Sequence, residues 1–139
     1  MRGKTRSVAL LLCALCALLA AGIVASSAAA KAKSHNVHMK ITKPCPQKGT
    51  KICGTYGGSP FGTCKMTGTL QIPKSTQTWK CPKGNITVKA VGTTGPANDA
   101  KGTWKMTGGT KKYKHIRGSG KFHGKLSTGI FTYRGTARY

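Results

Sequence analysis

The C-terminal part of the chain alternates apolar and polar side chains with a period of two, and this pattern restricts the fold more than any other feature. In the last segment Phe131, Tyr133, Ala137 and Tyr139 fall on one side, and threonines and arginines fall on the other. One apolar side at a period of two is typical of a half-buried β-strand. Residues 102–139 therefore predict three strands joined at glycines, the last of them held in a sheet.

The same alternation occurs upstream, in the segments 37–41, 64–72, 76–81 and 86–90. Outside the first thirty residues no segment has a convincing helical pattern, because glycine recurs every few residues and threonine is abundant. Many short strands at regular spacing favour a sandwich or a barrel, and closure into a barrel removes the exposed sheet edges. We predict an all-β fold, a single antiparallel β-barrel of about eight short strands, preceded by a helical signal peptide.

Residues 1–30 have the pattern of a cleavable signal peptide. Three basic residues precede an apolar segment over 8–24, and Ala28–Ala30 supply the small residues of a cleavage site. The alternatives are a membrane anchor, for which an apolar run of about 17 residues is at the short limit, and a lipoprotein. Cys13 and Cys16 lack the small preceding residue that a lipoprotein signal requires. We therefore expect a secreted or extracytoplasmic protein of the cell envelope, with no transmembrane span after cleavage.

The remaining residues are few enough to form one domain. We expect residues 31–61 to contain a flexible basic lead-in over 31–38, a first short strand and a Cys-containing loop. The loop prediction rests on the prolines and glycines between residues 43 and 62. Residues 62–139 are expected to form the main part of the single β-barrel domain.

Four cysteines follow the signal peptide. An even number of cysteines in an exported chain predicts two disulfides, with three possible connectivities. We favour the pairing of sequence neighbours, and each bond would stabilise the fold by roughly 2.5–3 kcal/mol. A zinc site is the competing interpretation, but no C-x2-C pair is present. The cysteines are Cys45, Cys53, Cys64 and Cys81.

The charged side chains of this protein are almost all positive. There are 24 Lys and Arg against one acidic residue, Asp99. Without the three basic residues of the signal peptide, 21 remain against one acid, a formal charge of +20. Such a field attracts anionic polymers or a membrane surface. The lysines are spread along the whole chain, so we predict no specific recognition of nucleic acid.

We find no candidate catalytic, cofactor-binding or metal-binding set, and the sequence favours a protein that is not an enzyme. There is no Glu, and Asp99 lies in a loop rich in Gly, Pro and Asn. His115 and His123 would share a face in one unbroken strand, but the glycines between them predict a bend. A Cys–His nucleophile pair with Cys64 or Cys81 would be disarmed by oxidation on export.

Large apolar residues at strand spacing usually belong to a core. Some of those in this chain are candidates for the lining of a ligand cavity, and an exposed stacking platform for sugars or bases is the alternative. The candidate cavity-lining residues are Met66, Trp79, Trp104, Met106, Phe131 and Tyr133.

Two segments resemble a known family. Residues 102–104 and 108–120 follow the pattern G-T-W, G-G-T-G-K-Y-x-G-I-x-G-S-G, except that Lys111 and His115 stand where the pattern has glycine. This pattern, with the ending at 128–135, resembles small secreted bacterial members of the allene oxide cyclase-like and dirigent-like β-barrel superfamily. The resemblance implies an antiparallel barrel with a central apolar cavity, and in some relatives a cyclase or stereo-directing activity. The cyclase relatives use a buried carboxylate, and this chain has no Glu.

Three functional hypotheses follow. The first is a non-enzymatic, disulfide-stapled binding protein for an anionic envelope component or a small apolar ligand. The second is an isomerase-like, cyclase-like or dirigent-like helper that acts on a small apolar ligand in the barrel cavity. The third is a cationic defence or toxin-like factor, which the absence of an amphipathic helix disfavours.

Overall fold

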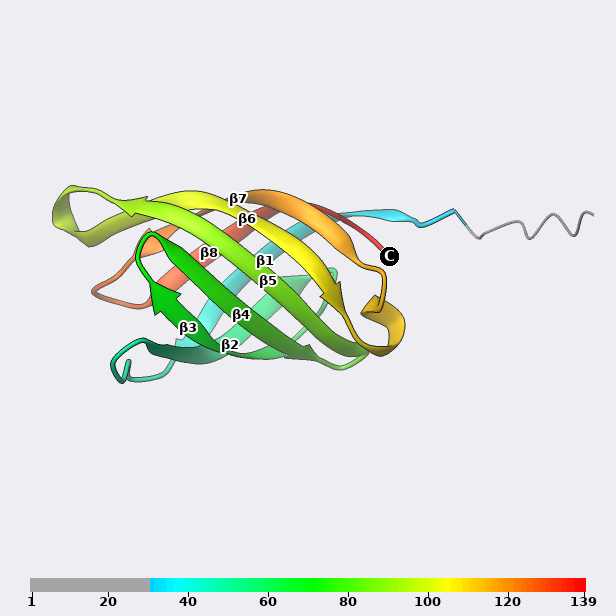
Figure 1. Ribbon diagram of the computed structural model, residues 1–139, viewed down its shortest axis with the longest axis horizontal. Coiled ribbons are helices and arrows are strands. Elements are labelled where there is room, and N and C mark those ends of the chain that lie inside the picture. Colours follow the sequence, from blue (N-terminus) through cyan, green and yellow to red (C-terminus); the bar gives the residue numbers. More distant parts are fainter. Residues whose placement is uncertain (1–30) are drawn as a thin grey trace, which may run out of the picture. The chain divides into compact units, whose positions relative to one another are not determined.

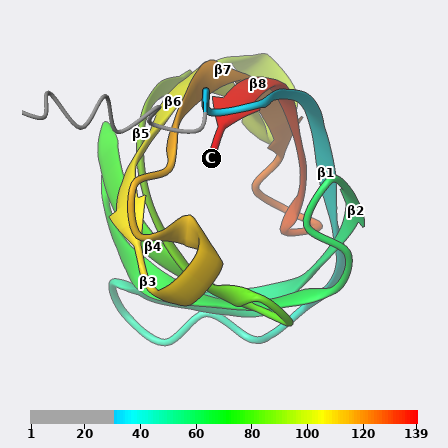
Figure 2. The ribbon, with the colours of Figure 1, turned by 90° about the vertical axis from the view of Figure 1, so that its right-hand side faces the viewer.

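The computed structural model describes residues 31–139, which form a closed antiparallel barrel of eight strands (Figures 1 and 2). Each strand pairs with the next in sequence, and β8 closes the sheet by pairing with β1. The predicted fold class is confirmed, whereas the predicted signal peptide lies outside the described residues. The strands are β1 (Ser34–Pro44), β2 (Lys51–Ser59), β3 (Cys64–Gln71), β4 (Lys74–Cys81), β5 (Gly84–Thr94), β6 (Asp99–Gly109), β7 (Arg117–Lys125) and β8 (Ile130–Arg138), with short 3-10 helices η1 (Pro96–Asn98) and η2 (Lys111–Tyr113).

The period of two places one face of every strand inside the barrel. In β5, for example, Ile86, Val88 and Ala90 are buried, while Lys89 between them is exposed. The inward side chains of all eight strands form one apolar core, whereas every Lys and Arg from residue 31 to 139 is exposed. In the same part of the chain, no helix is long and apolar enough to cross a membrane.

Two predictions in the N-terminal part of the barrel are wrong. The expected flexible lead-in over 31–38 is mostly strand, because β1 begins at Ser34 and pairs with β8 from its first residue. The segment expected to be a loop contains β2. At least one glycine of that segment is required by strand pairing and does not mark a loop. Gly58 has a φ of +148°, and a Cβ there would collide with the carbonyl oxygen of His38 in β1. Close pairing with β1 explains this glycine.

Two disulfides link strands that are neighbours in the sheet. Cys45, directly after β1, is bonded to Cys53 in β2, and their Cα atoms are 5.5 Å apart. Cys64 at the start of β3 is bonded to Cys81 at the end of β4, with a Cα separation of 4.2 Å. The bonds therefore join sequence neighbours, and they lie at opposite ends of the barrel.

One end of the barrel is plugged by aromatic side chains. Phe61, before β3, has its ring centroid 5.4 Å from that of Tyr113 in η2 and 5.8 Å from that of Tyr139 after β8. Phe61 and Tyr113 are almost fully buried, as is Ile116. Figure 2 shows the segment with η2 curling across this end. The fold therefore seals this end with side chains brought from three distant segments.

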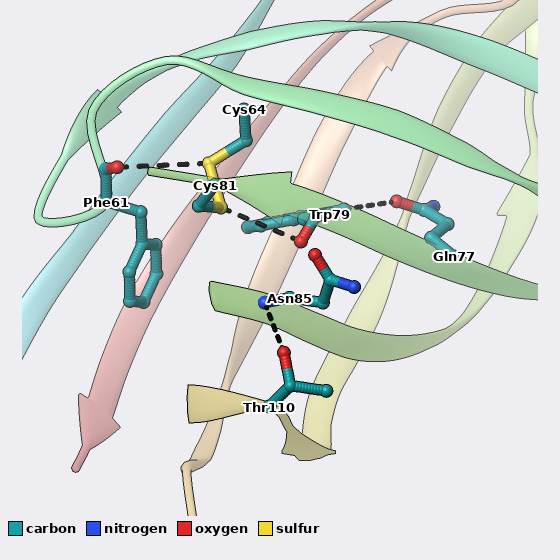
Figure 3. The surroundings of a disulfide bond; sticks show 7 residues. All are labelled: Phe61, Cys64, Gln77, Trp79, Cys81, Asn85 and Thr110. Carbon is teal, nitrogen blue, oxygen red and sulfur yellow. Dashed lines mark hydrogen bonds between the residues drawn. A yellow bond between two sulfur atoms is a disulfide. The ribbon is translucent and has the colours of Figure 1, made fainter. Parts of the chain in front are cut away.

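Two hydrogen bonds between Asn85 and Thr110 hold the η2 segment over the plugged end. The backbone N–H of Asn85 in β5 donates to Oγ1 of Thr110 at 3.0 Å, and the N–H of Thr110 donates to the carbonyl oxygen of Asn85 at 2.9 Å. Figure 3 shows this contact beside the Cys64–Cys81 disulfide, where Sγ of Cys64 lies 3.9 Å from the carbonyl oxygen of Phe61. The disulfide and the η2 segment thus support Phe61 from two sides.

We expect Phe61→Ala to destabilise the barrel by about 3–5 kcal/mol, because it removes a buried aromatic ring and leaves a cavity in the plug. The measurement is equilibrium denaturant unfolding with both disulfides intact. Ile72→Ala is the control, since Ile72 is 66% exposed and should change stability by only about 0.5 kcal/mol. Equal losses for the two variants would show that the plug does not stabilise the fold.

Candidate ligand-binding cavity

The end opposite the plug contains a cavity of about 490 Å³. All eight strands contribute to its lining, together with the turns β1–β2, β3–β4 and β7–β8. These turns lie at the left end of the barrel in Figure 1. Several lining residues in them, such as Gln47, Ile72 and Ser127, are exposed. The cavity therefore opens to solvent at this end, which we call the open end.

The walls of the cavity are apolar. They carry aliphatic side chains from β1 to β3 on one side and aromatic side chains from β7 and β8 on the other. Phe122 and Phe131 pack edge to face with ring centroids 6.2 Å apart, and Phe122 stacks on Tyr133 at 5.4 Å. The main apolar wall residues are Ile41, Ile52, Met66, Leu70, Phe122 and Phe131.

The floor of the cavity is a hydrogen-bonded polar cluster centred on Gln77 of β4. Oε1 of Gln77 accepts from Nε1 of Trp79 at 2.9 Å and from the hydroxyl of Tyr56 at 3.2 Å. Nε2 of Gln77 donates to the hydroxyl of Tyr133 at 2.9 Å and to Oγ of Ser75 at 3.2 Å. Gln77 is only 4% exposed, so these four bonds satisfy an amide that water does not reach. We call Tyr56, Ser75, Gln77 and Tyr133, all of which line the cavity, the floor cluster.

The two tyrosines of the floor cluster are held in the protonated form. Burial raises the pKa of Tyr56 well above its ordinary value of 10.0, and the neighbouring Tyr133 raises it further. Burial also raises the pKa of Tyr133, although hydrogen bonds with Tyr56 and Gln77 partly oppose the shift. Both side chains are therefore neutral hydroxyl groups at physiological pH.

The lining of the cavity carries no ionisable acid or base other than tyrosine. No Lys, Arg, His, Asp or Glu lies among its lining residues, and Cys45 and Cys53 are joined as a disulfide. Asp99 is 61% exposed and lies 3.9 Å from Nζ of Lys125, outside the cavity. What the arrangement can do is enclose an apolar molecule and present hydroxyl groups to it.

The six candidate lining residues from the sequence separate into two groups. Met66, Phe131 and Tyr133 line the cavity. Trp79 lies behind the floor, where its indole N–H contacts Gln77. Trp104 is buried and donates from Nε1 to the carbonyl oxygen of Lys121 at 3.1 Å. Met106 lines a separate pocket formed by residues of β6, β7 and β8.

Sequence reasoning missed most of the floor. Ser75 and Gln77 were not singled out, although they precede Trp79 and Cys81 at a period of two on the same inward face of β4. Polar residues at inward positions are the signal that was available, because a buried amide requires hydrogen-bonding partners. Tyr56 was missed because its strand was interpreted as a loop.

The histidines are not gathered into a site. His115 lies in the turn before β7 and His123 lies within β7, and both are exposed. His35 in β1 stacks on Tyr139 at 4.5 Å. Across residues 31–139, no three His, Cys, Asp or Glu side chains come together as a metal site would require.

Comparisons with protein-family models, with curated proteins and with solved structures gave no match for this chain. Its class is thus defined by geometry: a small, basic, disulfide-linked β-barrel with an apolar cavity that is open at one end.

Alkaline pH should destabilise the barrel through the floor tyrosines. A raised pKa in the fold means that stability is fully present below the unfolded value of about 10 and is lost as pH rises above it. We expect Tyr133→Phe to lose less stability than the parent protein between neutral and strongly alkaline pH. Denaturant unfolding at each pH measures this loss. All other side chains are common to both proteins, so parallel curves of stability against pH would contradict the assignment.

Proposed function

We propose that this protein is an exported, non-enzymatic binding protein that holds a small, mainly apolar ligand in the open end of the barrel. The observation that carries the proposal is the cavity itself. Its volume of about 490 Å³ falls within the roughly 300–1,000 Å³ of ligand pockets, and apolar walls with a few convergent polar groups are typical of such pockets. The two disulfides are compatible with the oxidising location that export implies.

A helper role on a bound ligand, as in the allene oxide cyclase-like and dirigent-like superfamily, is the second candidate. The closed eight-stranded barrel and its apolar cavity favour this relationship. Charge-stabilising catalysis needs a preorganised group aimed at the reacting centre, and the only polar groups on the floor are neutral hydroxyls and an amide. Binding without chemical change therefore accounts for the cavity with fewer assumptions. Recovery of a chemically altered ligand after incubation would favour the helper role instead.

An uncharged fluorescent probe, N-phenyl-1-naphthylamine, tests the binding proposal. We expect it to bind with one site per barrel, and we expect Leu70→Trp to weaken binding at least about tenfold by filling the cavity. Thr69→Trp is the matched control, because Thr69 is the adjacent residue of β3 and faces outward. Absence of probe binding to the parent protein, or equal weakening by both variants, would refute an open cavity that takes apolar ligands.

We further propose that the open end contacts an anionic membrane surface of the envelope. Among the described residues, the large apolar side chains that are exposed are Ile72, Val91 and Ile130. Ile72 lies in the β3–β4 turn, Val91 pairs with the first residue of β4, and Ile130 begins β8, so all three are near the open end. Exposed lysines such as Lys48 and Lys74 accompany them. Apolar residues next to lysines are the chemistry that an anionic lipid surface attracts.

Vesicle binding of two charge variants tests this orientation. Lys74→Gln and Lys114→Gln each remove one positive charge, the first at the open end and the second at the plugged end. We expect Lys74→Gln to weaken binding to phosphatidylglycerol vesicles about fivefold, as for a lysine near an anionic surface, and Lys114→Gln to change it little. Binding should fall as salt rises. Equal effects of the two variants would indicate adsorption by the overall charge.

A further inference from the structure

We infer that the ligand of the open cavity is uncharged and carries a hydrogen-bond-accepting oxygen, such as a carbonyl, ester or ether oxygen, which lies against Tyr133 and Ser75. The inference rests on the proposed binding function and specifies the chemistry of the ligand. It follows from the direction of the hydrogen bonds in the floor cluster.

Trp79 sets the orientation of the Gln77 amide. The indole Nε1 can only donate a hydrogen bond, so the amide atom that faces it at 2.9 Å must be the oxygen. Nε2 of Gln77 is then directed toward Tyr133 and Ser75, to which it donates at 2.9 Å and 3.2 Å. Both hydrogens of the amide nitrogen are used, and its oxygen accepts two bonds. Gln77 has therefore no further hydrogen-bonding capacity to offer a ligand.

The hydroxyl groups that accept from Gln77 keep their own hydrogens. A hydroxyl has one hydrogen to donate as well as lone pairs to accept with, so Tyr133 and Ser75 can each donate to another partner. Both residues line the cavity. Tyr56 differs, because it donates its hydrogen to Oε1 of Gln77. The floor thus presents hydrogen-bond donors to the cavity. The ligand group that fits it best is therefore a hydrogen-bond acceptor.

The lining also selects against a charged ligand. A carboxylate at the floor would be buried without a cation, since no Lys, Arg or His lines the cavity, and burial of an unpaired charge is strongly unfavourable. An ammonium group would equally lack a carboxylate. The positive charge of the barrel lies on its outer surface, where water and salt screen it. The interior therefore favours a neutral acceptor, although the outside attracts anions.

Three probes with equal chain length separate these possibilities: a medium-chain methyl ketone, the corresponding alkane and the corresponding fatty-acid carboxylate. Each is titrated by displacement of N-phenyl-1-naphthylamine from the parent protein, from Tyr133→Phe and from Ser75→Ala. We expect Tyr133→Phe to weaken ketone binding about fivefold, which corresponds to the loss of one net hydrogen bond. The affinity for the alkane should change by less than about twofold. Ser75→Ala should act in the same direction and disturbs a less buried position.

Tyr113→Phe is the matched control, because it removes a tyrosine hydroxyl from the plugged end. It should change the affinity for neither the ketone nor the alkane. Equal weakening of ketone and alkane by both floor variants would overturn the inference while leaving the binding function in place. Carboxylate binding that is tighter than ketone binding and insensitive to both floor variants would also overturn the inference. If neither uncharged probe displaces the dye, and the dye itself does not bind the parent protein, the proposed function fails as well.

Discussion

The pairing of β8 with β1 is the interaction on which the rest of the structure depends. It runs from Ser34 opposite Arg138 to Lys40 opposite Thr132, and it turns an open sheet with two unpaired edges into a barrel with none. The closure also brings Tyr139 against His35 and Phe61, which completes the plug. The same closure places Tyr133 within hydrogen-bonding distance of Gln77, 56 residues away in sequence.

Gln77 divides the interior into two halves with different roles. Between it and the plug, Trp79, Phe61 and their neighbours fill the barrel with side chains. On its other side the interior is open and apolar. A buried amide is unfavourable unless all its bonds are made, and a fully satisfied one fixes the positions of its partners. The four bonds of Gln77 therefore give the cavity a rigid floor with defined donors.

The outer surface and the cavity have opposite electrostatic character. Every Lys and Arg of the barrel is exposed, and one acidic side chain, Asp99, accompanies them. Repulsion between so many like charges opposes the compact state, and two disulfides between neighbouring strands oppose its unfolding. No Lys, Arg, His, Asp or Glu lines the cavity. This contrast supports the two proposals made above, that the outside contacts an anionic surface and that the inside holds a neutral molecule.

The sequence by itself determined most of the strands and most of the side chains that face inward, since a period of two is a local property of an extended backbone. It indicated the all-β barrel and located most of its strands along the chain. It misled at β2, where the glycines that allow close pairing with β1 have the composition of a loop. The tertiary structure alone decided how far along the barrel each inward residue lies. Met66, Phe131 and Tyr133 reach the cavity, whereas Trp79, Trp104 and Met106 do not. That position depends on the stagger between strands and on closure of the sheet, which are set by pairing between distant segments and leave no periodic trace in the sequence.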